Sequence, residues 1–452
     1  MSGGTRNALA DLAPLEALID KCVHCGFCLP TCPSYLLLGQ EMDSPRGRIY
    51  LMRAGVESRL TLNTTVVDHF DTCLGCMACE TACPSGVRYA PLIEQTRATI
   101  EHHHRRPLGD RLLRRLLFAI LPFRRRLRAA VVPLALFNSL FRRPRDLSFD
   151  RKRVLPGHNG VGPAENRDIA GPQTGPWKTV RSALSLAPPV RVSDLMKETP
   201  ELTPAAGERR LRVGLLTGCV QSAFFADVNR ATARVLSAEG CEVAAPQAQE
   251  CCGALALHAG EDKNARKRAR DLIQTFEDAH VDVVAVNAAG CGSAMKEYGH
   301  LLKDDPAWSA RAAAFASKVR DVSEILASLP AQAPRKPMNL RVAYHDACHL
   351  AHAQGVRREP RQLLESIPGV AVVPIAESDI CCGSAGIFNL MQPDMAAALG
   401  RRKAGHIETA QPDLVVTSNP GCILQIRAAA REQGYPYDVV HLVELLDKAM
   451  GP

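Results

Sequence analysis

Two copies of one cysteine pattern, C-x2-C-x2-C-x3-C-P, lie near the start of the chain and constrain its fold more than any other feature. They read CVHCGFCLPTCP at residues 22–33 and CLGCMACETACP at residues 73–84. Three cysteines at this spacing bind one iron–sulfur cube. The fourth, before proline, ligates the other cube in ferredoxin motifs with two clusters. The pattern therefore predicts two 4Fe–4S clusters with exchanged fourth ligands.

The exchange assigns four cysteines to each cluster. We expect the clusters to be bound by Cys22, Cys25, Cys28 and Cys83, and by Cys73, Cys76, Cys79 and Cys32. Structural zinc is the alternative, because C-x2-C pairs also hold zinc. Two separated pairs would explain neither the third cysteine nor the proline. The residues between the two motifs have helical periodicity, so residues 1–100 are predicted to form an α-helical two-cluster ferredoxin domain.

Of the 17 cysteines, nine lie outside these two motifs, and eight of those nine follow an internal repeat. Residues 210–335 (the first CCG unit) and 336–452 (the second CCG unit) each contain a single cysteine, a Cys-Cys-Gly triplet and a last cysteine. In chain order these are Cys219, Cys251, Cys252 and Cys291, then Cys348, Cys381, Cys382 and Cys422. Short apolar β-type runs alternate with helical stretches, which predicts two repeated α/β domains with parallel sheets. The cysteines are expected in loops at the strand ends.

Four thiols in each CCG unit could converge, since a vicinal pair shares one short turn and the following glycine allows a close approach. The pattern is compatible with one further iron–sulfur cluster in each unit or one in total. Buried core thiols or a redox-active disulfide are the alternatives. His258, His345 and His349 lie near these cysteines in sequence, and either tune a cluster and carry protons or are structural. Cys241 has no counterpart in the repeat and is predicted to be a core residue.

A strongly basic segment follows the first domain. Residues 105–153 contain fifteen Lys or Arg and three Asp or Glu, although the whole chain has a net charge of only +8. In residues 105–145 apolar side chains alternate with arginine at helical spacing. This predicts a pair of basic amphipathic helices that lie on an anionic membrane or pack on a CCG unit or a partner subunit. Nucleic acid is not expected, because no recognition motif accompanies the charge.

The segment 101–209 is completed by Pro/Gly-rich residues, and 155–204 are predicted to be a linker or surface loop. No apolar run approaches the ~18 residues that a membrane-spanning helix needs. The chain also shows no apolar signal segment, and clustered cysteines in such a chain favour metal binding over disulfides. We therefore expect a cytoplasmic protein.

Three strings carry a family resemblance: CVHCGFCLPTCPSYLLLGQEMDSPRGRIYLM, CMACETACPSGVRY and the twin CCG units. Over nearly its whole length the chain resembles the iron–sulfur subunit of glycolate oxidase (glycolate dehydrogenase). Lactate-utilisation iron–sulfur proteins, the C subunit of anaerobic glycerol-3-phosphate dehydrogenase and heterodisulfide reductase subunits share the plan. In the last of these the CCG unit ends in C-x2-C, whereas here that final cysteine is missing in both units.

The resemblance implies that substrate oxidation and electron transfer take place in different subunits. A partner subunit containing FAD would oxidise glycolate to glyoxylate, and this chain would pass the electrons to quinone or another respiratory-chain acceptor. No catalytic residue is expected here, and no G-x-G-x-x-G fingerprint is present. The expected location is then peripheral, on the inner face of the cytoplasmic membrane. The alternatives are a subunit of a lactate or glycerol-3-phosphate complex, or a disulfide or quinone reductase centred on the CCG units.

Overall fold

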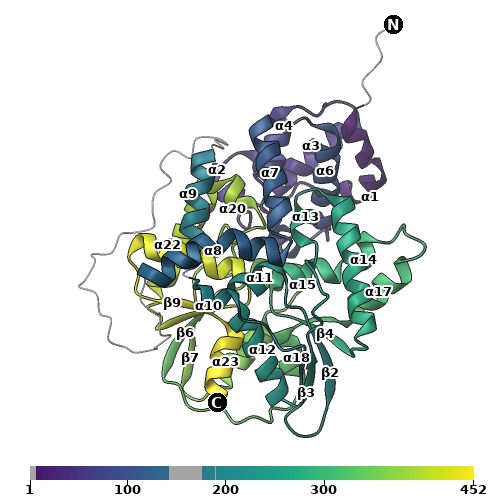
Figure 1. Cartoon of the computed structure of the whole chain (residues 1–452). Coiled ribbons are helices and arrows are strands. Elements are labelled where there is room, and N and C mark those ends of the chain that lie inside the picture. The colour runs from purple at the N-terminus through teal and green to yellow at the C-terminus, as the bar shows by residue number, and fades with distance from the viewer. Residues whose placement is uncertain (1–6, 142–175, 189, 452) are drawn as a thin grey trace.

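The structure, a computed structural model, describes residues 7–141, 176–188 and 190–451. Figure 1 shows the N-terminal helices, in purple, packed above two α/β units. The first CCG unit, in teal and green, and the second, in green and yellow, lie side by side beneath them. A helical N-terminal region followed by two α/β units is the order that the sequence predicts.

The N-terminal region is built from short helices joined by the cysteine loops. Its elements are the 3₁₀ helices η1 (Ala8–Leu15) and η2 (Glu41–Asp43), with α1 (Glu16–Ile19), α2 (Pro33–Leu38), α3 (Pro45–Val56), α4 (Thr64–Asp71), α5 (Ala78–Thr81) and α6 (Tyr89–His103). Ser44 caps the start of helix α3, because its hydroxyl accepts a hydrogen bond from the Gly47 amide at 3.0 Å. Pro45 occupies the first turn, where its missing amide hydrogen costs nothing.

The first CCG unit contains a five-stranded sheet in the order β1-β3-β2-β4-β5, parallel except for the edge strand β1. Its strands are β1 (Leu202–Thr203), β2 (Leu211–Leu215), β3 (Cys241–Ala244), β4 (Val283–Val286) and β5 (Val319–Asp321). Its helices are α11 (Cys219–Phe224), α12 (Ala226–Ala238), α13 (Ala254–His258), α14 (Asp262–Asp278), α15 (Ala289–Lys296), α16 (Tyr298–Leu301), α17 (Ser309–Lys318) and α18 (Val322–Ser328).

The second CCG unit repeats this topology, with a parallel sheet in the order β7-β6-β8-β9. Its strands are β6 (Leu340–Tyr344), β7 (Val370–Val373), β8 (Leu414–Thr417) and β9 (Asp438–His441). Its helices are the π-helix η3 (His349–Ala353), α19 (Arg358–Glu365), α20 (Phe388–Met391), α21 (Pro393–Thr409), α22 (Pro420–Gln433) and α23 (Leu442–Met450).

The repeat extends to single hydrogen bonds. Asp282 Oδ2 accepts from the Arg212 amide at 2.7 Å, and at the matching positions Asp413 Oδ2 accepts from the Arg341 amide at 2.8 Å. The two units are nevertheless not independent, because one buried apolar cluster contains residues from both sheets, among them Val213 and Val342. The two units therefore share a core, which fixes the cysteines of one unit relative to those of the other.

Between the ferredoxin-like region and the CCG units, the basic segment forms the predicted helix pair, α7 (Leu108–Ile120) and α8 (Arg124–Phe141). Residues 155–175 of the predicted linker 155–204 lie outside the described residues. The rest of the linker contains regular secondary structure. It forms α9 (Pro176–Leu186), α10 (Val192–Leu195) and strand β1. Helix α9 is held by tertiary contacts that sequence periodicity does not reveal.

Two of these contacts anchor α9 to the second CCG unit. The hydroxyl of Thr179 donates to the carbonyl oxygen of Leu390 at 3.0 Å, and that of Ser182 to the carbonyl oxygen of Asn389 at 2.8 Å.

Among the helices of the described ranges, none combines the length and apolar character that crossing a membrane requires.

Candidate functional site

The first cysteine set, Cys22, Cys25, Cys28 and Cys83, lines one small cavity near the molecular surface, and Cys79 also reaches the wall of this cavity. Three of its members lie in the loop between α1 and α2, where Gly26 adopts a φ of 89°. This left-handed conformation favours glycine, and a Cβ atom there would also lie 2.8 Å from Arg46 Nη1. Burial raises the pKa of Cys28 to about 11, whereas Cys25 is exposed.

The second cysteine set, Cys32, Cys73, Cys76 and Cys79, lines another small cavity deeper in the molecule. Cys32 directly precedes α2, Cys73 and Cys76 lie in the loop that leads into α5, and Cys79 lies in α5 itself. Although burial alone would raise the pKa of Cys73, the guanidinium groups of Arg48 and Arg97 outweigh it, and this pKa is lowered. Neighbouring positive charge thus favours the thiolate that a metal requires.

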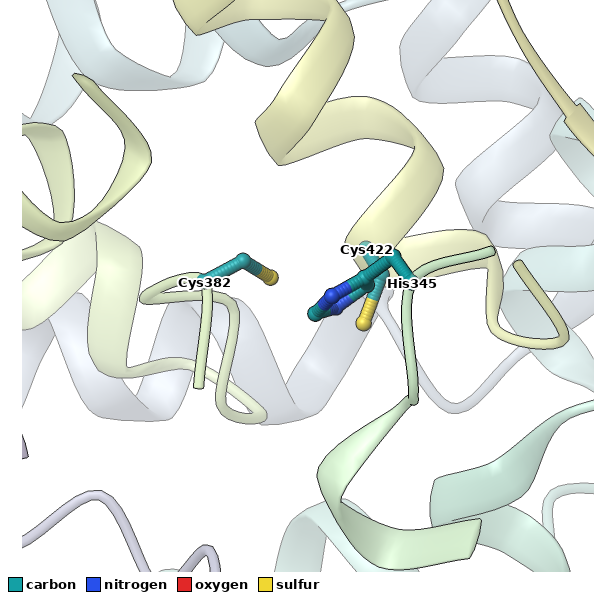
Figure 2. Close-up of side chains that lie close together, drawn as sticks. All are labelled: His345, Cys382 and Cys422. Atoms are coloured by element: carbon teal, nitrogen blue, oxygen red, sulfur yellow. The ribbon is translucent and has the colours of Figure 1, made fainter. Parts of the chain in front are cut away.

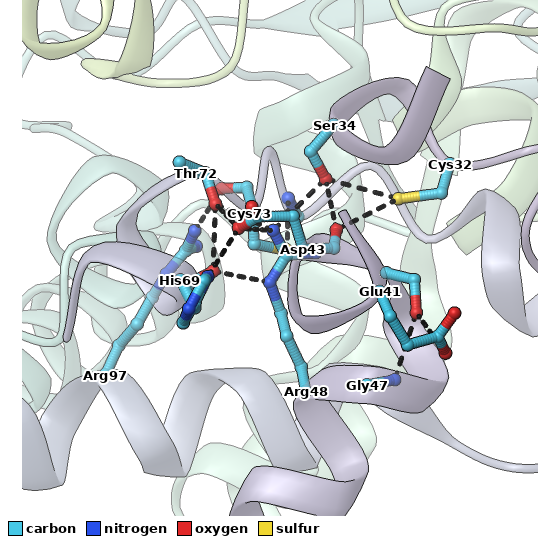
Figure 3. Close-up of polar contacts among 12 residues, drawn as sticks. Cys32, Ser34, Glu41, Asp43, Gly47, Arg48, His69, Thr72, Cys73 and Arg97 are labelled. Carbon is cyan, nitrogen blue, oxygen red and sulfur yellow. Dashed lines mark hydrogen bonds and ion pairs between the residues drawn. The ribbon is translucent and has the colours of Figure 1, made fainter. Parts of the chain in front are cut away.

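A buried arginine lies behind the second cysteine set (Figure 3). Arg48 is 1% exposed and donates to the carbonyl oxygen of His69 at 2.6 Å and to the hydroxyl of Thr72 at 2.9 Å. It also donates to the hydroxyl of Ser34, which lies 3.2 Å from Cys32 Sγ, and its Nη2 lies 3.6 Å from Asp43 Oδ1. The network ties α3 and α4 to both cysteine loops. The sequence analysis did not single out Arg48, although it lies inside the SPRGRIYL string.

In the first CCG unit the four repeat cysteines come together. Cys219 Sγ lies 3.5 Å from Cys251 Sγ, and the Cys252 thiol interacts with those of Cys251 and Cys291. The pKa of Cys251 is lowered well below its usual value, mainly by the hydrogen bond from Cys219 and then by Cys252. The group lies beyond the carboxyl ends of β2, β3 and β4, where ligand sites of open α/β sheets form.

The second CCG unit brings its four cysteines together in the same way, with Cys348 Sγ 3.9 Å from Cys381 Sγ. Here a histidine joins them. The ligand atoms of His345, Cys382 and Cys422 all lie within 4.8 Å of one another, and Figure 2 shows these side chains converging. The pKa of Cys382 is lowered well below its usual value by the neighbouring thiols of Cys381 and Cys422 and then by His345.

The position of the cysteines differs in one respect from the expectation. Cys219, Cys291 and Cys422 lie in the first turns of α11, α15 and α22, whereas loops at the strand ends were expected. The strand-to-helix connections are short, so the helices begin at or just before these cysteines.

All 17 cysteines lie in the described ranges and none is disulfide-bonded. Cys241 is a fully buried core residue of β3, as predicted.

The second cysteine set contacts the second CCG unit directly. Cys76 and Cys348 belong to one buried cluster, together with Cys381 and Phe388. Arg97 reinforces the junction with the first CCG unit, because its guanidinium donates both to the carbonyl oxygen of Cys73 and to that of His258. The molecule therefore contains a series of thiols that leads from the surface to the second CCG unit.

Between the two CCG units lies a mostly apolar cavity of about 480 Å³. Thiols of both units reach its wall, and the rest is formed in part by apolar side chains of α8 and α9, including Leu134 and Leu184. His258 and His349 also line it, with ring centres 4.9 Å apart. Burial lowers the pKa of both histidines, so they are neutral at pH 7.

Helix α7 of the basic segment has two apolar faces. On α7, Leu113, Leu117 and Phe118 pack against Ile387 and Met391, which fits the predicted packing of a helical hairpin on a CCG unit. Another face of the same helix is not covered by any residue in the described ranges. It carries Leu108, Leu112 and Leu116, which are 81%, 70% and 54% exposed.

Comparisons with known proteins agree with this arrangement. Residues 18–87 match the 4Fe-4S dicluster domain family, and residues 213–296 and 342–427 each match the cysteine-rich domain family. The chain is 37% identical to the probable glycolate oxidase iron-sulfur subunit of Bacillus subtilis, covering 96% of this chain and 95% of that protein. It is 34% identical to the glycolate oxidase iron-sulfur subunit of Escherichia coli, with the same coverage.

A shorter relative matches about half of the chain. The lactate utilization protein A of Geobacillus kaustophilus is 32% identical over 238 residues, which are 52% of this chain and 99% of that protein. The converging thiol sets and the matched domains define an iron–sulfur electron-transfer protein. More specifically, the chain belongs to the family of glycolate oxidase iron–sulfur subunits, as the sequence resemblance indicated.

Proposed function

We propose that this chain is the electron-transfer subunit of a glycolate-oxidising complex, with a partner subunit that holds FAD. The carrying observation is the buried contact between the second cysteine set, at Cys76, and the second CCG unit, at Cys348. The thiols of the two ferredoxin sets would each hold one 4Fe–4S cluster, with Cys32 and Cys83 exchanged between the sets. Such clusters store and pass single electrons. The converging CCG cysteines would hold further metal centres.

The entry side lies at the first cysteine set. Cys25 is exposed there, and its neighbours Val23 and Phe27 are exposed large apolar residues. Exposed apolar side chains around a redox site are typical of a docking surface. We assign this surface to the flavoprotein partner, because electrons would then enter at the set that lies furthest from the CCG units.

The exit side lies at the cavity between the CCG units. Its apolar walls suit a lipophilic quinone, which takes up two electrons and two protons to become a quinol. Glu94 can supply protons from behind His258, since its carboxyl lies 3.7 Å from His258 Nδ1. Burial raises the pKa of Glu94 to about 8, so the carboxyl holds a proton at neutral pH.

A peripheral position on the inner face of the cytoplasmic membrane follows from the same assignment. The uncovered leucines of α7 lie beside the exposed arginines Arg111 and Arg115. A helix with this pattern lies in the interface of an anionic membrane, with its leucines in the acyl region and its arginines on phosphates. This would place the cavity, whose wall is partly formed by α8, close to a membrane quinone.

The test uses the chain purified anaerobically from its own cells together with its bound partner. Glycolate is added, and reduction of the iron–sulfur centres is followed by EPR. Reduction by glycolate supports the proposal. Reduction by lactate and not by glycolate would overturn the assignment of glycolate as the substrate. It would favour a role like that of the lactate utilization relative. A signal with dithionite but with neither acid would overturn the proposed partner.

A further inference from the structure

We infer that the second CCG unit binds its metal through a mixed nitrogen and sulfur donor set in which His345 Nε2 is a ligand beside Cys382 and Cys422. The inference rests on the metal-binding role proposed above for the CCG cysteines, but not on the substrate. The three donor atoms lie within 4.8 Å of one another, and all three residues are buried. They converge from separate elements, since His345 follows β6, Cys382 lies in the loop after β7, and Cys422 lies in α22 (Figure 2).

The imidazole of His345 is oriented as a ligand. Its Nδ1 lies 3.0 Å from the carbonyl oxygen of Ser378, and because a carbonyl can only accept, Nδ1 carries the hydrogen. In this tautomer the lone pair of the ring is on Nε2. That atom is buried and has no hydrogen-bond partner among the described residues. A histidine that ligates a metal typically donates its other N–H in this way, whereas an unpaired buried nitrogen without a metal is costly.

The first CCG unit provides an internal comparison. Leu216 occupies the position that matches His345, and both residues continue the hydrogen bonding of their sheets through their amides. Leu216 is buried among apolar residues of its unit. The fold therefore does not require histidine at this position. Its presence in one unit alone, directed at two thiols, points to a ligand function and not to packing.

Charge around the site agrees with bound thiolates. The buried ammonium group of Lys403 is held by the carbonyl oxygen of Glu377 and interacts electrostatically with the thiols of Cys382 and Cys381. Asn419 Nδ2 donates to Cys422 Sγ at 3.4 Å. Thiolate and imidazole ligands together suit zinc or the iron of an iron–sulfur cluster. In a cluster, a histidine in place of a thiolate raises the reduction potential, which would make the second unit the stronger electron acceptor.

The test compares the wild-type chain with His345→Leu, which introduces the residue that the first unit already accommodates. Both proteins are purified anaerobically, and their iron and zinc contents are measured. Nitrogen at zinc is detected by X-ray absorption, and nitrogen at paramagnetic iron by pulsed EPR with ¹⁵N-labelled histidine. We expect a directly bonded histidine nitrogen in the wild type and complete loss of that signature in His345→Leu.

His406→Gln serves as the matched control, because His406 lies in the same unit but is paired with Glu377. It should retain the nitrogen signature. If the wild type holds metal in the second unit without a nitrogen ligand, or if His345→Leu keeps the nitrogen signature, the inference is overturned while the electron-transfer role stands. If the second unit holds no metal, both the inference and the metal-binding role proposed for this unit are overturned.

Discussion

The ring nitrogen Nε2 of His349 lies 2.8 Å from the carbonyl oxygen of Gly75. Gly75 lies between Cys73 and Cys76, and His349 follows Cys348, so this hydrogen bond joins the cysteine loops of two domains that are far apart in the sequence. The bond also keeps the His349 ring against the cavity between the CCG units. The junction between the ferredoxin-like region and the second CCG unit is therefore the place where interruption of electron flow is most informative.

Replacing Cys76 by Ser should remove the EPR signal of the second cysteine set and stop glycolate from reducing any centre in the CCG units. The partner's flavin should still be reduced, because the entry side at Cys25 is unchanged. Both effects are measured in one anaerobic titration with optical and EPR detection. Cys241→Ala is the control, since Cys241 lies in the core of β3 and should leave all signals in place. Normal turnover in Cys76→Ser would show that electrons bypass this set.

Replacing Arg48 by Met should destabilise the ferredoxin-like region by about 3–5 kcal/mol, since Asp43 would remain buried beside His69 and the Thr72 hydroxyl but without the arginine charge. Hydrogen bonds to the cysteine loops would be lost as well. The expected readout is a lower melting temperature of the anaerobic holoprotein and faster loss of iron on warming. The control Arg59→Met removes an exposed pair with Glu57 and should change stability by less than about 1 kcal/mol. Equal stabilities of the two variants would exclude a structural role for the Arg48 network.

Regular patterns in the sequence account for most of the fold. The sequence repeat that relates Cys219 to Cys348 corresponds to two units whose parallel strands have the same order. The two ferredoxin motifs correspond to two cysteine sets, each of which lines a small cavity. These features were accessible because each is encoded by a periodic or repeated local signal.

Features that depend on contacts between residues far apart in the chain could not be predicted from the sequence. Helix α9 was missed because its position depends on backbone carbonyls of Asn389 and Leu390, more than two hundred residues away. Arg48 and Arg97 are unremarkable in sequence and acquire a role only when folding brings the cysteine loops to them. His345 was noticed for its proximity to Cys348 in the chain, but the structure directs its free nitrogen to Cys382 and Cys422 instead.

Stability should fall as the pH rises from 6 to 8, and Glu94→Gln should remove part of this dependence. Burial, followed by the charge of Glu297, raises the pKa of Glu94 to about 8, from about 4.3 in an unfolded chain. The folded state thus binds this proton more tightly. The contribution of this proton to the free energy of unfolding is fully present below the pKa that Glu94 has in the unfolded chain. It is lost as the pH rises through the pKa of Glu94 in the folded protein.

The expected loss for Glu94 between pH 6 and 8 is about 2 kcal/mol. Melting temperatures of the anaerobic holoprotein across this range give the comparison. Arg97 lies nearby and Glu80 also faces the carboxyl, so the mutant must be compared at several pH values and not at one. Parallel profiles for wild type and Glu94→Gln would mean that the carboxyl ionises normally.

The uncovered face of α7 predicts a measurable membrane affinity. Vesicles that contain an anionic phospholipid should bind the wild-type chain in a flotation assay, and the double substitution Leu112→Ser, Leu116→Ser should lower the bound fraction by at least tenfold. Each buried leucine contributes about 1.5–3 kcal/mol to such partitioning. Leu202→Ser, at an exposed leucine of strand β1, should bind like the wild type. Raised salt should weaken binding through the exposed arginines such as Arg111 and Arg115. If the double variant floats with vesicles as well as the wild type, the leucine face is instead a contact for a partner subunit.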